Sequence, residues 1–336
     1  MMSKTAYLHV GAGKTGTSAI QAALPSLREQ LLDHGVLYPE DITLSEVQAK
    51  RGEVSSGNAL TLARLTNLSL PRPVNWQFHN SVKWLNQCLD LAILHNSDIL
   101  FSNEHLQFAE LDKLQEVLNV ILGRGFAVKV IFYVRTAIDY SISAYLQKLK
   151  VGAFPSGVPT SLAAHLLNDR LPFWKTLKTF SEASGISGIS VRNYDQLRPR
   201  LLESFVSDFI PNFVEHKLGF TSINRSLTPL EQMAFETIYS LPNGNSVCKK
   251  LGSQLDKWPR DCNVKKFFVD QDTLSIFESN NKPIITMINR NFLDQGTELS
   301  INTMDSPIHS DPVMHADAIS QLPATFSRII CSLCQE

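Results

Sequence analysis

The chain has 336 residues, and its 31 Lys and Arg residues nearly balance its 32 Asp and Glu residues, which gives a formal net charge of −1. This balance excludes the strong overall positive field that attracts nucleic acid or an anionic membrane surface, so any anion site must be local. The longest apolar run, residues 127–134, contains Lys129 and is too short to span a bilayer. Five scattered cysteines do not resemble a disulfide framework, and the first residues do not resemble a secretory signal. We therefore expect a cytoplasmic protein with no membrane span and no nucleic-acid partner.

The stretch after the first apolar run carries the clearest chemical signal. Residues 6–10 are apolar and lead into a turn rich in glycine and hydroxyl side chains. Apolar residues then recur with helical spacing as far as Leu32, which places the turn at a helix N-terminus, where unpaired N–H groups and the helix dipole favour an anion. Pro25 is expected to kink or split that helix. The residues predicted to hold the anion are Gly13, Lys14, Thr15, Gly16, Thr17 and Ser18.

Apolar runs alternate with segments of helical spacing along most of the chain. The further predicted strands are residues 36–38, 98–102, 127–134 and 189–194. The further predicted helices are residues 76–94, 111–122, 136–150, 162–180, 201–210 and 267–293, with one more that begins at Thr228 and Pro229. Such alternation predicts an α/β fold in which helices cover both faces of a central parallel sheet. The polar residues 40–75 are expected to form a surface excursion, and residues 151–160 a loop.

Chemically useful side chains follow the ends of several predicted strands. Lys14, Glu104 and Arg135 come just after such strands, and Tyr194 ends one. Because ligands in open parallel sheets bind at the carboxyl ends of the strands, we expect these four residues to converge on one edge of the sheet.

Two common phosphate-binding interpretations fit the first turn poorly. A nucleoside-triphosphate loop needs a glycine five positions before Gly13, and Leu8 stands there instead. The predicted third strand also ends in Ser-Asn-Glu104, without the usual aspartate for magnesium. A dinucleotide fingerprint matches the three glycines, but the second strand runs into Tyr38 and Pro39 rather than into an acidic residue.

A third interpretation rests on a resemblance. The segment Lys14-Thr-Gly-Thr-Ser18 after the first strand, combined with Arg135 and Ser143 after the central strand, resembles the sulfotransferases that use 3′-phosphoadenosine 5′-phosphosulfate (PAPS). The resemblance is closest to bacterial sulfotransferase-like proteins and extends in patches over residues 5–295. It implies a P-loop-like three-layer fold in which the first loop holds the 5′-phosphosulfate. It also implies that Arg135 and Ser143 hold the 3′-phosphate and that Tyr194 lies near the adenine.

The same resemblance implies roles in catalysis. Sulfuryl transfer from PAPS leaves PAP (3′-phosphoadenosine 5′-phosphate) as product, and it benefits from a cation at the leaving group and a base at the acceptor. Lys14 matches the cation. Glu104 and His105 are both candidates for the base, and Glu104 is preferred because its Ser-x-Glu context resembles the bacterial members. No metal is expected, and the acceptor is a hydroxyl or amine compound, for example a carbohydrate.

The expected organisation is one sulfotransferase-like α/β domain over residues 1–295, mostly helical from residue 225, followed by a weakly patterned tail at 296–336. Two other functions remain open. One is a P-loop nucleotide-dependent kinase-like enzyme, and the other is a non-catalytic nucleotide-binding module.

Several polar residues are expected to have no role in chemistry. His9 lies within the first strand and is predicted to be a core histidine. Arg225 is interpreted as an exposed loop arginine rather than a further ligand of the 3′-phosphate. His309 and His315 are expected in a solvated tail, and Cys331 with Cys334 is expected to be an incidental pair.

Overall fold

The computed structural model describes residues 4–41, 57–72, 76–155, 157–158, 160–211, 213, 225–255, 266–302 and 307–327. These residues pack as two compact units. Unit 1 takes its members from residues 1–135, 172–223 and 287–299, and unit 2 from residues 136–171, 224–286 and 300–336. The expected domain boundary at residue 295 stays a prediction.

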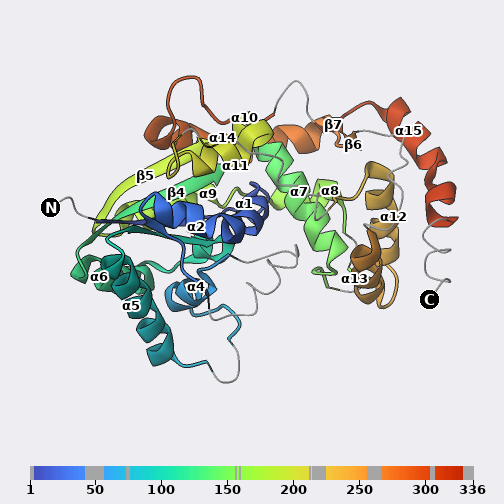
Figure 1. Cartoon of the computed structure of the whole chain (residues 1–336). Helices are drawn as coiled ribbons and strands as arrows, with labels where there is room; N and C mark the ends of the chain where they lie inside the picture. The colour runs from blue at the N-terminus through green and yellow to red at the C-terminus, as the bar shows by residue number, and fades with distance from the viewer. Residues whose placement is uncertain are drawn as a thin grey trace. The chain divides into compact units, whose positions relative to one another are not determined.

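A five-stranded parallel sheet forms the centre of unit 1, in the order β2-β3-β1-β4-β5 (Figure 1). Its strands are β1 (Lys4–Val10), β2 (Val36–Leu37), β3 (Asp98–Asn103), β4 (Phe126–Val134) and β5 (Ile186–Asn193). The predicted parallel sheet and its five strands are confirmed. Only β5 differs clearly, because it begins before Gly188, which pairs with Lys129 beside an irregularity in the ladder.

Helices cover both faces of this sheet (Figure 1). On one face, α1 (Thr17–Ala23), α2 (Arg28–Asp33) and α11 (Leu201–Val206) bury apolar side chains against Leu100, Ile131 and Tyr133 of the strands. On the other face, Trp84 of α5 (Phe78–Leu94) packs on Phe101, and Phe173 of α9 (Phe173–Glu182) packs on Phe132. The helix α6 (Leu111–Gly123) also contacts β4. Unit 1 therefore has three layers, and its sheet is buried on both sides as continuous apolar strands require.

Proline positions explain two features of the helices. Pro25 lies at the start of the 3-10 segment Leu24–Leu27, which separates α1 from α2, so the predicted split of this helix is confirmed. The helix predicted at residues 162–180 is wrong as one element, because it forms α8 (Leu162–Asn168) and α9, with Pro172 as the N-cap of α9. A proline without an N–H and with a fixed φ is tolerated at a helix start but not in its interior.

The polar segment 40–75 is only partly described. Residues Leu60–Thr66 within it form the helix α4, so part of this segment is helical. Asn58 is buried beside α4 and donates to the carbonyl oxygens of Pro39 and Leu100 at 3.1 and 3.0 Å. Residues 42–56 and 73–75 lie outside the described residues.

Unit 2 is mainly helical. Its elements are α7 (Ala137–Lys150), α8, α12 (Pro229–Tyr239), α13 (Gly244–Gln254), the first part of α14 (Gln271–Phe292), α15 (Pro312–Ser320) and the parallel pair β6 (Phe267–Phe268) and β7 (Ile308–His309). Thr228 and Glu231 form a reciprocal capping box at the start of α12, which confirms the predicted helix start. The expectation of a solvated tail around His309 and His315 is wrong, because both side chains are half-buried on β7 and α15.

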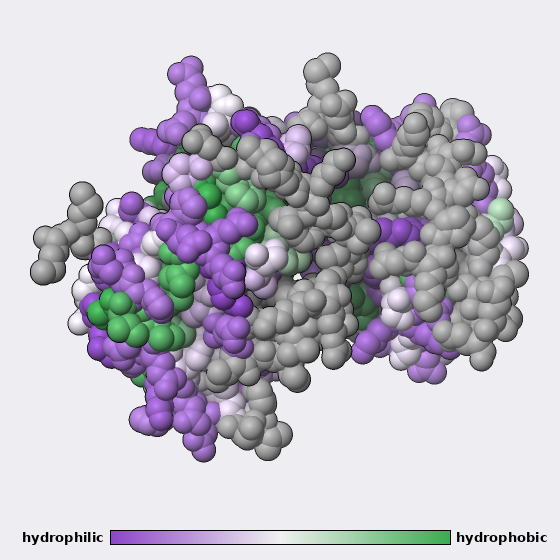
Figure 2. Space-filling view, viewed as in Figure 1, coloured by the Kyte–Doolittle hydropathy of each residue, from purple (hydrophilic) through white to green (hydrophobic). Residues whose placement is uncertain are grey.

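The surface of unit 1 is mixed in character. In Figure 2, hydrophilic side chains surround an apolar area over α5 and α6. The exposed apolar residues of these two helices include Leu91 and Leu94 of α5 and Leu111 of α6. Scattered exposed apolar residues are ordinary on protein surfaces. Within the described part of the chain, no helix combines the length and the apolar character needed to cross a membrane.

Candidate functional site

The loop between β1 and α1 is closed by its own hydroxyl groups. Thr15 Oγ1 and Thr17 Oγ1 both donate to the carbonyl oxygen of Ala12, at 2.6 and 3.3 Å, and both threonines are buried. Lys14 and Gly16 adopt left-handed backbone conformations with φ of 67° and 78°. The two threonines therefore fix the shape of the loop. That their hydroxyl groups donate hydrogen bonds to an anion stays a prediction, and it requires both hydroxyl hydrogens to turn away from the Ala12 carbonyl oxygen.

The three glycines of this loop serve different purposes. A Cβ atom at Gly11 would overlap the Thr17 side chain, and one at Gly16 would overlap Leu201 and Tyr194. These two glycines are required for packing, and Gly16 also for its positive φ. A Cβ atom at Gly13 would meet nothing within 4 Å. The loop therefore has open space beside Gly13, where a ligand can approach the backbone.

Arg135 connects this loop to the end of β5. Its Nη1 donates to the carbonyl oxygen of Lys14 at 3.1 Å, and its Nε lies 3.5 Å from Asp195 Oδ1. The guanidinium also lies over the ring of Tyr194, 5.4 Å from the centroid. The structure thus brings together Lys14, Arg135 and Tyr194 at the carboxyl edge of the sheet, as these residues follow β1, β4 and β5. Asp195 was not among the predicted site residues, although its place after Tyr194 at a strand end could have indicated it.

Glu104 and His105 follow β3 in a 3-10 turn, Glu104–Phe108. The strand ends at Asn103, so these two residues do not alternate between the two faces of the sheet as adjacent strand residues do. Asn103 instead caps the turn by accepting from the backbone N–H of His105 at 2.8 Å. The Glu104 Oε1 and His105 Nε2 atoms lie 3.9 Å apart, and about a third of each side chain is exposed. Both candidate bases are accessible and close enough to influence each other electrostatically.

The end of β3 is joined to the loop through the sheet. Asn103 pairs with Val10, the last residue of β1, and its carbonyl oxygen accepts from Gly11 N–H at 3.4 Å. Glu104 is therefore the first residue after β3, the strand that borders the loop. This arrangement places a candidate base directly after the strand that borders the candidate anion site.

A buried polar cluster lies beneath these segments. His9 Nδ1 is 2.8 Å from Ser102 Oγ, which also accepts from Gln21 Nε2 at 3.3 Å. His9 is fully buried against Tyr133 and Phe205, so the predicted core histidine is confirmed. Burial, helped by the positive charge of Arg192, lowers the pKa of His9 to about 3. The ring is therefore neutral at ordinary pH and structural in character.

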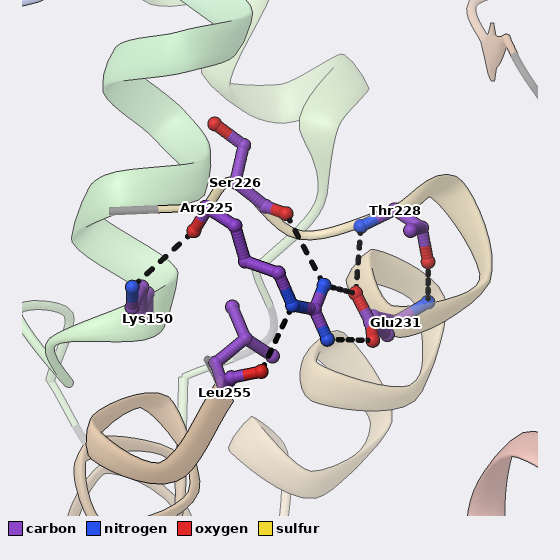
Figure 3. A network of polar contacts seen from close by, with 6 residues as sticks. All are labelled: Lys150, Arg225, Ser226, Thr228, Glu231 and Leu255. Carbon is purple, nitrogen blue, oxygen red and sulfur yellow. Dashed lines mark hydrogen bonds and ion pairs between the residues drawn. The ribbon is translucent and has the colours of Figure 1, made fainter. Parts of the chain in front are cut away.

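The two other arginine and serine candidates belong to unit 2. Ser143 lies on α7 and is half-buried, and its predicted pairing with Arg135 around a 3′-phosphate stays a prediction. The expectation that Arg225 is exposed is wrong, because its side chain is only 9% exposed and pairs with Glu231 (Figure 3). Arg225 Nη1 and Nη2 contact the two carboxylate oxygens at 2.8 and 2.7 Å, while Nε donates to Leu255 O at 2.8 Å. Arg225 thus belongs to the core of unit 2.

Within the described residues, no three His, Cys, Asp or Glu side chains are grouped so that they could hold a metal ion. Cys331 and Cys334 lie outside those residues. Comparison of the chain with protein-family models, with curated proteins and with solved structures found no match.

Proposed function

We propose that this protein is a sulfotransferase that moves a sulfuryl group from PAPS to an acceptor hydroxyl or amine. The proposal rests on the resemblance of residues 14–18, Arg135 and Ser143 to PAPS-dependent sulfotransferases. One observation carries it furthest: the Arg135 guanidinium contacts the Lys14 carbonyl and lies over Tyr194, so segments proposed for the phosphosulfate, a phosphate and the adenine adjoin one another. A nucleotide with charged groups at both ends needs such an arrangement.

The proposed binding of the reactive end uses the open side of the loop. The backbone around Gly13 is accessible, and the Lys14 ammonium supplies positive charge beside it. Asp195 near Arg135 keeps the guanidinium in place while the site is free of ligand. A phosphate group would compete with this carboxylate for Arg135, because guanidinium binds both through charge-assisted hydrogen bonds.

The topology favours this proposal over a dinucleotide enzyme. In the usual dinucleotide-binding sheet β2 lies beside β1, whereas here β3 separates them. Leu8, buried in β1, stands where a triphosphate loop has a glycine. We therefore propose a P-loop-like fold whose first loop is specialised for a phosphosulfate.

In the proposed reaction the acceptor oxygen or nitrogen forms a bond to sulfur, while the bond from sulfur to the bridging phosphate oxygen breaks. Lys14 stabilises the negative charge on the departing oxygen, and Glu104 accepts the acceptor proton. His105, 3.9 Å from Glu104, is the alternative base. The acceptor is proposed to be a carbohydrate or another hydroxyl or amine compound.

Calorimetry with PAP, ATP plus magnesium, and NAD tests the nucleotide class. We expect PAP to bind, and Arg135→Gln to weaken that binding, while exposed Arg124→Gln leaves it unchanged. Binding of ATP with magnesium but not of PAP would instead support the kinase-like alternative.

An acceptor screen with labelled PAPS tests catalysis. We expect product formation that is lost in Glu104→Gln or in His105→Ala, and the more severe of the two variants identifies the base. PAP binding without transfer to any acceptor class would favour the non-catalytic binding module. Full activity in both variants would remove the β3 end from the mechanism.

A further inference from the structure

Unit 2 contains a cavity that the proposed function does not use. Its volume is about 150 Å³, and its walls come from α8 and α12 on one side and from β6, β7 and α15 on the other. All lining residues belong to unit 2, whereas the loop site belongs to unit 1. The cavity is large enough for a small molecule of a few heavy atoms.

Two histidines give this cavity unused hydrogen-bonding capacity. His309 and Phe268 are direct neighbours across the β6–β7 pair, and His315 stacks on Phe268 with ring centroids 4.0 Å apart and planes inclined by 16°. The Nδ1 atoms of both histidines are buried, and neither has a hydrogen-bond partner among the described residues. Both rings line the cavity, so each imidazole can present an N–H to an anion bound there.

The two charged groups of the cavity walls, Glu236 and Lys266, differ in whether they have hydrogen-bond partners among the described residues. Glu236 Oε1 already accepts from Tyr145 Oη at 2.5 Å and from the Leu162 N–H at 2.8 Å. Lys266 is exposed and makes no hydrogen bond or ion pair with any residue in the described ranges. The carboxylate is therefore satisfied by its own unit, and the ammonium group remains able to bind an anion.

Much of the remaining wall is apolar. Leu162, Ala163, Pro229, Met233 and Phe268 line it. A fully hydrated inorganic anion would gain little from such a surface, whereas an apolar chain gains free energy when the surface removes it from water. The walls thus favour a ligand with an anionic end and an apolar body.

We propose that this cavity binds a small organic carboxylate, with its oxygens toward Lys266, His309 and His315 and its apolar part against Leu162, Met233 and Phe268. A cationic ligand is disfavoured because Lys266 repels it and the hydrogen bonds to Glu236 compete for that carboxylate. The inference is independent of the proposed sulfotransferase activity.

The protonation of His315 is linked to ligand binding by the same geometry. The titratable groups that line the cavity are Glu236 on α12, Lys266 before β6, His309 on β7 and His315 on α15. Burial, and then the neighbouring His309, lower the pKa of His315. A bound carboxylate opposes both effects by favouring the charged imidazole, so binding takes up protons and is tighter at acidic pH.

Calorimetric titration of the full chain with butanoate tests the proposal, in buffers without carboxylates at two pH values, one below and one above the ordinary histidine pKa. We expect saturable binding that weakens about tenfold or more at the higher pH, in line with the loss of a charge-assisted contact. Butanamide, butylammonium and inorganic sulfate serve as neutral, cationic and non-apolar probes, and each is expected to bind more weakly than butanoate.

Variants of two lining residues test whether butanoate binds in this cavity. Lys266→Met removes an exposed charge, and His315→Phe keeps a ring on Phe268 while removing the imidazole. We expect each to weaken butanoate binding about tenfold, whereas Lys282→Met, at an exposed position of α14, leaves it unchanged. Circular dichroism confirms that the variants are folded. No binding of butanoate, equal binding of sulfate or butylammonium, or full affinity in folded Lys266→Met and His315→Phe would each overturn the proposal.

Discussion

Arg135 and Arg225 are both arginines near a carboxylate, yet they differ in what they are available to do. Arg225 is held by Glu231 through two contacts of 2.7 and 2.8 Å, with both side chains less than a tenth exposed. Arg135 lies 3.5 Å from Asp195, is more exposed, and contacts a backbone carbonyl of the loop. The first arrangement stabilises a core, whereas the second leaves a cation at the edge of a sheet where a ligand can compete for it.

The difference shows that the element next to each arginine in the chain decides what the arginine can do. Arg225 precedes the capping box of α12, so the Glu231 that closes the helix start is also its partner. Arg135 follows a central parallel strand, where the sheet edge faces the space beyond the strands. The predictions below separate these two situations.

The largest expected effect is on stability, at Arg225. Arg225→Met leaves Glu231 buried without its partner, so we expect the free energy of unfolding to fall by about 3–5 kcal/mol. Urea unfolding followed by circular dichroism measures it. Arg124→Met, which removes an exposed pair with Asp90, should change stability by about 1 kcal/mol or less. A similar small change at Arg225 would contradict the core role assigned to it.

The variant Lys14→Asn tests whether the loop lysine takes part in the proposed reaction. Asparagine tolerates the left-handed backbone of residue 14 and keeps the carbonyl that Arg135 contacts, so the ammonium group is removed without straining the loop. We expect the rate of sulfuryl transfer to fall about 10²–10³-fold, comparable to loss of one group that stabilises a developing negative charge. Lys83→Asn on α5 is the control. Unchanged turnover in Lys14→Asn would remove Lys14 from the chemistry.

The variant Arg135→Gln tests whether Arg135, unlike Arg225, serves ligand binding rather than stability. Because Arg135 makes a longer contact than Arg225 does, 3.5 Å to a partly exposed Asp195, we expect stability to change by about 1 kcal/mol. PAP affinity should fall about 10–100-fold, as for loss of a charge-assisted contact. Parallel unfolding and calorimetry decide the matter: a large loss of stability with intact PAP binding would make Arg135 another core arginine.

The smallest effect concerns His9, a buried imidazole that stays neutral and has no carboxylate partner among the described residues. Its pKa is about 3 in the folded protein and about 6.5 when unfolded, so between these values the unfolded chain binds more protons. Stability is therefore complete above the unfolded pKa and falls with decreasing pH, by about 1 kcal/mol from about pH 7 to about pH 5.5. Urea unfolding at both pH values should show a flatter profile in His9→Gln. An equally steep profile in that variant would assign the effect to other groups.

Much of the fold could be predicted because local patterns and tertiary structure agree. The five strands and the break at Pro25 follow from apolar runs and from the missing N–H of proline, which are local properties. The break before α9 was missed although Pro172 indicates it, because the apolar helical period continues across residues 162–180.

The candidate site was predictable in position but not in detail. Strand ends indicated Lys14, Arg135 and Tyr194, because parallel strands end on one edge. The partners depend on three-dimensional packing: Thr15 and Thr17 donate to Ala12, and Asp195 lies beside Arg135. The burial of Arg225 depends on Leu255 and Glu231 coming together around it, which residue 225 alone does not indicate.

The order in which the chain visits its two units affects synthesis on a ribosome. Residues 224–286 of unit 2 are made before residues 287–299, which return to unit 1. There the Asn193 side chain at the end of β5 donates to the carbonyl oxygens of Thr297 and Glu298, at 3.3 and 3.1 Å. A nascent chain therefore cannot complete the strand end beside Tyr194 and Asp195 until residue 298 has emerged.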